Sequence, residues 1–189
     1  MNLDEAKKLF FSYHGDLFGL YRDGYDFEKT NIPTETINTW TAELAGQYEK
    51  TIQRGENLRV VLNTIFEYDN LSFENGQNKK FISNFYLSRR NSVDDFSKLL
   101  LCETLSEPSY KKYLQDCLPL LKEDIDNLAK KVNAGKFQID SSYYEENSDL
   151  MDEDFEKKEL QRRVNDLTER FFREPEPKKK GLFARLFHR

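Results

Sequence analysis

Residues 34–55 read TETINTWTAELAGQYEKTIQRG, and their apolar side chains follow the period of an α-helix. They lie three or four residues apart: Ile37, Trp40, Leu44, Tyr48 and Ile52. This spacing places them on one side of a helix, which other elements must cover to exclude water. Thr34 is expected to cap the helix at its start, and Gly55 is expected to end it.

The same spacing recurs on both sides of this helix. Upstream, residues 3–21 predict one amphipathic helix, with a capping box formed by Asn2 and Glu5 and with Gly24 as its stop. Downstream, residues 56–68 predict another helix. Because the pattern is repeated without strict alternation, we predict an all-α fold, an irregular bundle of about six to eight helices.

Residues 69–91 are ambiguous, because Asn75-Gly76 is a dipeptide typical of β-hairpins. The flanking residues do not alternate symmetrically, so we expect a loop and then a short helix through Phe81, Phe85 and Tyr86.

Two further helices are expected before residue 136. Ser92 and Asp95 have the spacing of a capping box for the first of them. The second is expected to be long, capped by Ser106, kinked at Pro119 and closed by Gly135.

The character of the chain changes after this helical body, which spans 1–135. Residues 140–156 contain eight acidic and no basic side chains, so we expect 136–151 to be a solvated acidic connector. A C-terminal helix is predicted at 152–173. Glu174-Pro175-Glu176-Pro177 then forms a stiff linker to a short basic amphipathic tail, which together occupy 174–189.

Composition narrows the class of protein. The 189 residues carry a formal charge of −5 and are only 38% hydrophobic, but they include 15 Phe and 10 Tyr, whose large apolar areas suffice for a core. Full-length disorder is therefore excluded, and two Cys are too few for a disulfide scaffold. Cys102 and Cys117 are expected to be buried thiols in a reducing compartment. The richness in Asn, Lys, Glu, Phe and Tyr favours a bacterial or phage origin.

The N-terminus lacks the basic start and apolar run of a secretory signal, and the chain has no apolar stretch of about 20 residues. We therefore expect a cytoplasmic protein. Its only expected membrane contact is peripheral, through the basic tail.

The tail is the most specific candidate for partner binding. Its residues 174–189 carry a net charge of +3, against −8 for the rest of the chain. The residues expected to make the contact are Lys178, Lys179, Lys180, Leu182, Phe183, Arg185, Leu186 and Phe187. On a helix the four apolar ones form a single stripe. An anionic membrane surface, a groove in a protein partner and the acidic segment 140–156 are equally good docking sites for it.

His14 is the only histidine outside the tail, so it is the candidate base or metal ligand, with Asp16, Asp23 or Asp26 as its helper. On the predicted helix it would lie between Phe10 and Phe18, where a hydrogen-bonded histidine at the edge of the core is the simpler interpretation. We expect no metal or other cofactor, because His and Cys are so few.

The basic pairs Lys79-Lys80 and Arg89-Arg90 flank aromatic residues, a mixture that can contact single-stranded nucleic acid. Without a larger basic stripe on a chain of negative charge, they favour an ordinary helix face.

The sequence thus favours a non-catalytic helical protein-interaction module, an adaptor or regulator, with a C-terminal tail that docks to a membrane surface or a partner groove. An alternative is an acidic inhibitor or immunity-type protein that occludes a basic toxin or nuclease. A third hypothesis is a hydrolase-type enzyme that uses His14 and the nearby Asp residues.

Overall fold

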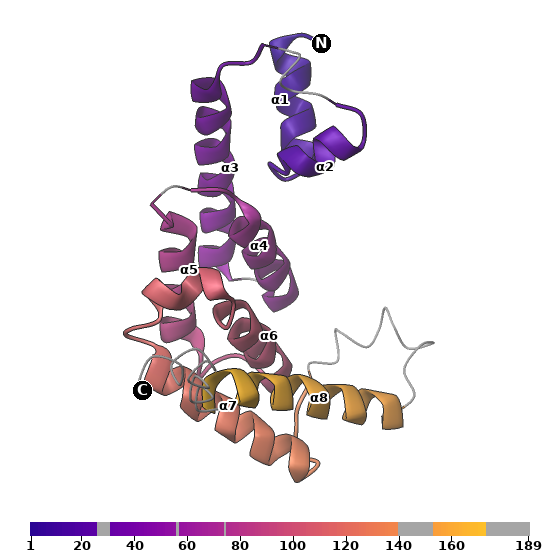
Figure 1. Cartoon of the computed structure of the whole chain (residues 1–189), viewed down its shortest axis with the longest axis vertical. Helices are drawn as coiled ribbons and strands as arrows, with labels where there is room; N and C mark the ends of the chain where they lie inside the picture. The colour runs from indigo at the N-terminus through magenta and orange to yellow at the C-terminus, as the bar shows by residue number, and fades with distance from the viewer. Residues whose placement is uncertain (26–30, 56, 74, 140–152, 173–189) are drawn as a thin grey trace, which may run out of the picture.

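The computed structural model describes residues 1–25, 31–55, 57–73, 75–139 and 153–172, and it confirms the all-α fold: every regular element in these ranges is helical (Figure 1). In chain order the helices are α1 (Leu3–Ser12), α2 (Leu17–Arg22), α3 (Thr34–Arg54), α4 (Leu58–Asn70), α5 (Gln77–Arg89), α6 (Asp95–Leu105), the 3₁₀ helix η2 (Pro108–Tyr113), α7 (Leu118–Asn133) and α8 (Glu153–Phe172). The α1–α2 pair lies beside α3 at one end of an elongated molecule, and α7 and α8 lie at the other end.

Helix α3 packs against α4 and matches its prediction closely. Trp40, Leu44, Tyr48 and Ile52 are all buried, as the spacing requires. Gly55 ends the helix in the left-handed conformation, with φ of 63°, which glycine adopts at little cost. The start differs from the prediction: Pro33 is the capping residue, and Thr34 is already the first residue of the helix.

The single helix predicted over 3–21 is wrong, because the chain breaks between α1 and α2. The Asn2–Glu5 capping box is present at the start of α1. His14 and Gly15 then adopt positive φ angles of 54° and 78°, which no helix tolerates. A Cβ atom at Gly15 would come within 2.8 Å of Leu71, so the turn packs tightly against the residue that follows α4.

The ambiguous region folds as a loop and then a helix, as predicted, since α5 begins at Gln77. The predicted cap of α6 is wrong. Asp94, not Ser92, accepts the backbone N–H groups of Phe96 and Ser97. Asp95 is buried instead, where it accepts hydrogen bonds from the Lys131 ammonium and from the backbone of Gln138.

The long kinked helix predicted from Ser106 is also wrong, because η2 and α7 are separate elements. Glu107, not Ser106, precedes η2, and Pro119 lies in the first turn of α7. A proline is harmless there, because the first-turn N–H groups have no partner within the helix. Gly135 closes α7 as predicted, with φ of 64°.

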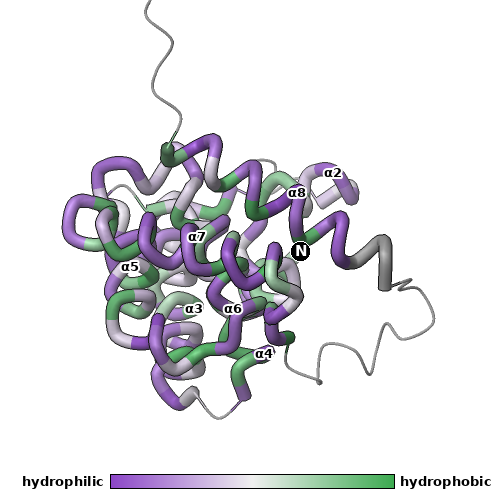
Figure 2. Tube along the Cα trace, turned by 90° about the horizontal axis from the view of Figure 1, so that it is seen from below, coloured by the Kyte–Doolittle hydropathy of each residue, from purple (hydrophilic) through white to green (hydrophobic). Residues whose placement is uncertain are grey.

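Helix α8 packs along α7 and against α6. It buries Leu160, Val164 and Leu167, and the hydropathy colours alternate along both α7 and α8, as helices with one apolar side require (Figure 2). Residues 140–151 of the predicted acidic connector, residue 152 and all of 173–189 lie outside the described residues. Cys102 and Cys117 are buried free thiols, as expected. None of the described helices is both long and apolar enough to cross a bilayer.

Candidate functional site

Helix α2 turns an apolar surface outward. Phe18 is 74% exposed and Tyr21 is 66% exposed, and Leu17 and Tyr25 beside them are exposed as well. We call these four residues the α2 aromatic face. Clustered exposed side chains of this kind are unusual on a folded chain and mark contact surfaces.

This orientation is built locally. The Asp16 carboxylate accepts the backbone N–H of Gly19 and so caps α2. A Cβ atom at residue 19 would lie 2.5 Å from that carboxylate, so a glycine fits there best. Leu20, fully buried, anchors the other side of the helix. Anchoring through Leu20 directs Leu17, Phe18 and Tyr21 away from the core.

Next to this face, a hollow of about 580 Å³ opens between the α1–α2 turn and the end of α4. It is lined by Tyr13, His14, Gly15, Asp16, Leu17, Glu67, Asn70 and Ser72. Leu17 belongs to both the hollow and the α2 aromatic face, so the two form one continuous surface. Asp16 and Glu67 make the hollow acidic, and no Lys or Arg is among the residues that line it.

The structure gives His14 partners that the sequence did not indicate. Its Nδ1 atom lies 2.8 Å from the Tyr48 hydroxyl and 3.1 Å from a Glu67 carboxylate oxygen. Asp16 is engaged as the cap of α2, and Asp23 accepts a hydrogen bond from Tyr13 and pairs with Arg22. The third predicted helper, Asp26, lies outside the described residues.

The contacts with Tyr48 and Glu67 fix the position of the His14 ring. Burial, followed by the negative charge of Glu67, raises the pKa of the Tyr48 phenol, which therefore stays protonated. The Tyr48 hydroxyl can donate a hydrogen bond to an Nδ1 that carries no hydrogen, or an Nδ1–H group can donate a hydrogen bond to Glu67. Ser72 lines the same hollow, but within the described ranges no hydrogen bond joins its hydroxyl to His14.

A second hollow, of about 330 Å³, adjoins the first, since Asn70 and Ser72 line both. It extends to η2, where Ser109, Lys112 and Tyr113 line it. We call the two hollows together the α4–η2 groove. The groove runs from η2, past the end of α4, to the α2 aromatic face, and neither family resemblance nor sequence spacing signalled it.

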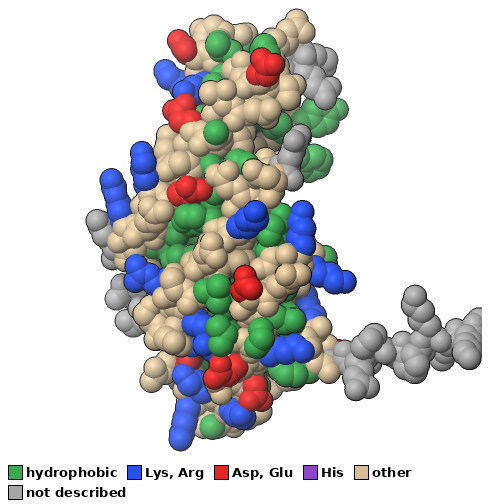
Figure 3. All heavy atoms as spheres, turned by 90° about the vertical axis from the view of Figure 1, so that its left-hand side faces the viewer, with side chains coloured by type: hydrophobic (Ala, Val, Ile, Leu, Met, Phe, Trp, Pro, Cys, Tyr) green, Lys and Arg blue, Asp and Glu red, His purple; other side chains and the backbone are tan. Residues whose placement is uncertain are grey.

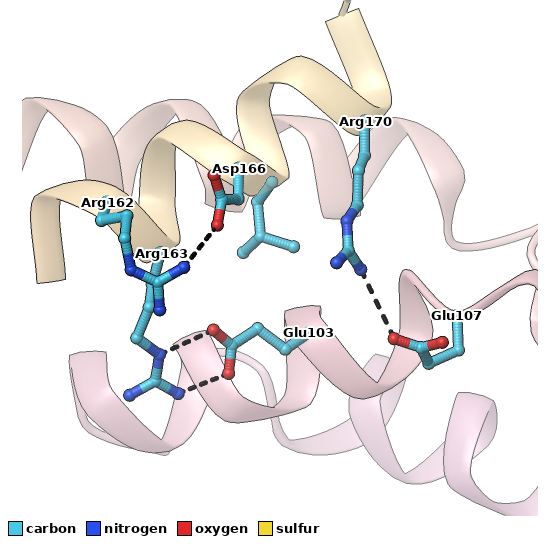
Figure 4. Close-up of a pocket in the computed structure, with 7 residues that line it drawn as sticks. Glu103, Glu107, Arg162, Arg163, Asp166 and Arg170 are labelled. Carbon is cyan, nitrogen blue, oxygen red and sulfur yellow. Dashed lines mark hydrogen bonds and ion pairs between the residues drawn. The ribbon is translucent and has the colours of Figure 1, made fainter. Parts of the chain in front are cut away.

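A third hollow, between α8 and α6, is filled by ion pairs (Figure 4). Arg163 donates through two nitrogens to the two carboxylate oxygens of Glu103, and Arg170 reaches Glu107. Arg162 pairs with Asp166 on its own helix. Since each of these guanidinium groups already has a carboxylate partner, the hollow joins α8 to the body and offers no uncompensated charge to a ligand.

One residue of each basic pair considered for nucleic-acid contact is engaged within the protein. Lys79 is mostly buried and pairs with Asp69, and Arg90 binds both Glu123 and Asp124. On the face that Figure 3 shows, Lys and Arg are interspersed with Asp, Glu and apolar side chains rather than gathered into a stripe. Among the described residues, no group of His, Cys, Asp and Glu is arranged to hold a metal ion.

The predicted docking residues 178–187 of the tail lie outside the described residues. The α2 aromatic face was missed because Leu17 and Leu20 both fit the apolar stripe of one long helix. The turn at Gly15 instead reorients α2, so that Leu20 is buried and Leu17 is exposed. Comparison with known protein families, with curated proteins and with solved structures finds no match to this chain. The fold and the site together describe an all-helical protein with a surface aromatic cluster beside an acidic hollow.

Proposed function

We propose that this chain is a non-catalytic helical protein-interaction module, an adaptor or regulator, that binds a protein partner on the α2 aromatic face. The observation that supports this is the outward clustering of Leu17, Phe18, Tyr21 and Tyr25, which include the two most exposed large hydrophobic side chains of the described residues, Phe18 and Tyr21. Exposed aromatic residues supply large contact area with little side-chain entropy to lose, and such residues dominate binding energy at interfaces.

The partner best suited to this surface is a segment that carries both apolar and basic side chains. Its apolar side chains would cover Phe18 and Tyr21, and a Lys or Arg would enter the hollow beside Asp16 and Glu67. Those carboxylates argue against an anionic membrane as the ligand of this face, because like charges repel. The basic tail is proposed as the second contact of the module, toward a membrane surface or a partner groove.

The test is a tagged pull-down from cells that express the natural gene, with three forms of the full chain. Phe18→Ala with Tyr21→Ala removes the centre of the face, and Val60→Ala is the control because Val60 is also an exposed apolar residue, on α4. We expect the wild type and the control to capture the same polypeptide and the double variant to lose it. Equal capture by all three forms would rule out the α2 aromatic face as the binding surface.

A further inference from the structure

We infer that the chain's own C-terminal tail docks along the α4–η2 groove and covers the α2 aromatic face, so that the tail competes with the partner. Only the competition rests on the proposed function; the docking rests on the groove and on the sequence of the tail. The contact is intramolecular and masks the binding surface until a stronger ligand displaces it.

The groove begins where α8 ends. Arg170, in the last turn of α8, donates to the Ser106 hydroxyl at 2.8 Å and to Glu107 at 3.4 Å. Ser109, two residues after Glu107, already lines the η2 end of the groove. The chain that follows Phe172 therefore starts beside the groove rather than on a distant face.

The η2 end of the groove is tied to its α2 end through the protein itself. The Tyr110 hydroxyl of η2 donates to Asp69 at the end of α4. Glu67, two residues before Asp69 on α4, contacts His14 in the α1–α2 turn. Two side-chain contacts thus span the distance between η2 and the hollow that adjoins α2.

Along the proposed path, the charges of the tail are opposite to those of the groove at both ends. Glu174 and Glu176 follow Arg173 just after α8, where the groove carries Lys112. Asp69 and Lys79 also line this end of the groove, but they pair with each other. The three lysines 178–180 come next, where the groove carries Glu67 and Asp16. A segment that docked in the reverse direction would place like charges against each other at both ends.

The apolar residues of the tail come last. Leu182 lies ten positions after Phe172, which gives an extended, proline-containing segment a reach of roughly 30 Å. Leu182, Phe183, Leu186 and Phe187 would then lie near the α2 aromatic face. Apolar groups on both partners leave water together, which supplies the binding free energy that charges alone do not.

The test uses the full chain with a nitroxide label at Ala184→Cys, a position off the apolar stripe. Cys102 and Cys117 are fully buried, so the label reacts at the new thiol. We expect amide signals of residues 17–25 and 70–72 to lose most of their intensity while the label is paramagnetic, and those of 126–131 on α7 to keep it. Undiminished signals at 17–25 would overturn the inference.

Two outcomes identify other occupants. Mixing labelled chains with unlabelled, isotope-enriched chains removes the effect if docking is intramolecular, so an effect that persists means the tail of a second copy and overturns the inference. Loss of signal confined to residues 140–156 would mean that the tail binds the acidic connector instead, which also overturns it.

The charge order is tested in the tail, where a substitution leaves the packed helices untouched. Lys179→Glu with Lys180→Glu should restore most of the intensity at 17–25. Lys157→Glu with Lys158→Glu is the matched control, because it makes the same charge change at exposed positions of α8, and it should leave the effect in place. Equal amide intensities at residues 17–25 in the two variants would contradict the charge match.

None of these measurements needs a partner, so their outcome is independent of the pull-down.

Discussion

Tyrosines at the two ends of this molecule are used in opposite ways. In the α4–α7 part, Tyr68, Tyr86 and Tyr110 are fully buried, and each donates its hydroxyl to a carboxylate, of Glu49, Asp124 and Asp69 respectively. In the α2 aromatic face, Tyr21 and Tyr25 are exposed. A buried phenol requires a hydrogen-bond partner, whereas an exposed one keeps its polar group available for a ligand. The same residue type thus stabilises the fold in one region and stays exposed on the surface in the other.

Asp124 is the centre of the buried arrangement. Its side chain is 3% exposed and accepts the Tyr86 hydroxyl at 2.6 Å and two Arg90 nitrogens at 2.8 Å each. Lys98 lies 3.6 Å away. One carboxylate on α7 therefore satisfies groups from α5 and faces one from α6, which joins three helices through charge-assisted bonds.

Removing that carboxylate gives the largest effect that we predict. Asp124→Ala leaves the Arg90 charge and the Tyr86 hydroxyl without their shared acceptor, and breaking a buried ion pair in this way costs about 3–5 kcal/mol. For a chain of this size the melting temperature should fall by on the order of 10 °C. Asp126→Ala is the control, since Asp126 forms only an exposed pair with Lys130 and should cost about 0.5 kcal/mol or less. A similar loss in both variants, measured by thermal and urea unfolding, would show that the buried network does not hold this end together.

A smaller effect is expected from pH. Burial alone would raise the pKa of Asp124, but the hydrogen bonds from Arg90 and Tyr86 outweigh it and hold the pKa below its usual value. The folded state therefore binds this proton less readily than the unfolded chain, in which an Asp titrates near a pKa of about 3.9. The stabilisation is fully present above that pH and is lost as pH falls toward the lower pKa of the folded state.

The check is the free energy of unfolding between about pH 5 and pH 2, where an Asp of lowered pKa titrates, for the wild type, Asp124→Asn and Asp126→Asn. Asp124→Asn should show a shallower acid loss than the other two, because it has no proton to take up at this site. An acid slope that all three proteins share would assign the loss to other carboxylates.

The smallest effect is expected at the opposite end. Phe18→Ser with Tyr21→Ser removes two large aromatic side chains. In a chain shortened to residues 1–173, which lacks the tail, the double variant should change stability by about 0.5 kcal/mol or less, because the packed helices leave both side chains exposed. Phe10→Ser, in the same helical pair but buried against Trp40, should cost about 3–5 kcal/mol. If the double variant instead melts several degrees lower, these aromatics belong to the fold, and the contrast between the two ends disappears.

The pattern of apolar residues was sufficient to predict most of the helical segments, but not the breaks between α1 and α2 and between η2 and α7. Spacings of three and four residues directed Trp40, Leu44 and Tyr48 to one side of α3, and burial of that side follows from the hydrophobic effect wherever the helix lies. Gly55 and Gly135 were predictable for a similarly local reason, since a left-handed residue at the end of a helix favours glycine in any context.

The remaining features depended on residues far apart in the sequence. His14 was recognised as a candidate, but its partner Tyr48 lies 34 residues away, and only the packing of the turn against α3 and α4 brings them together. Asp95 has the spacing of a capping residue, yet it binds the ammonium of Lys131, 36 residues further on, instead of capping the helix. The Asn78 amide likewise donates across the intervening loop to the carbonyls of Tyr68 and Asp69, near the end of α4.

The sequence by itself determined most of the segments that are helical, because helix periodicity is a local property of a few consecutive residues, but it did not determine the breaks after α1 and after η2. Only the tertiary structure decided which apolar residues stay in water. Leu17 and Leu20 are indistinguishable in the apolar spacing of the sequence. The turn at Gly15 orients α2 so that Leu20 is buried in the core, whereas Leu17, Phe18 and Tyr21 are exposed. The direction in which a short helix faces is set by its contacts with distant elements, and no local spacing encodes those contacts.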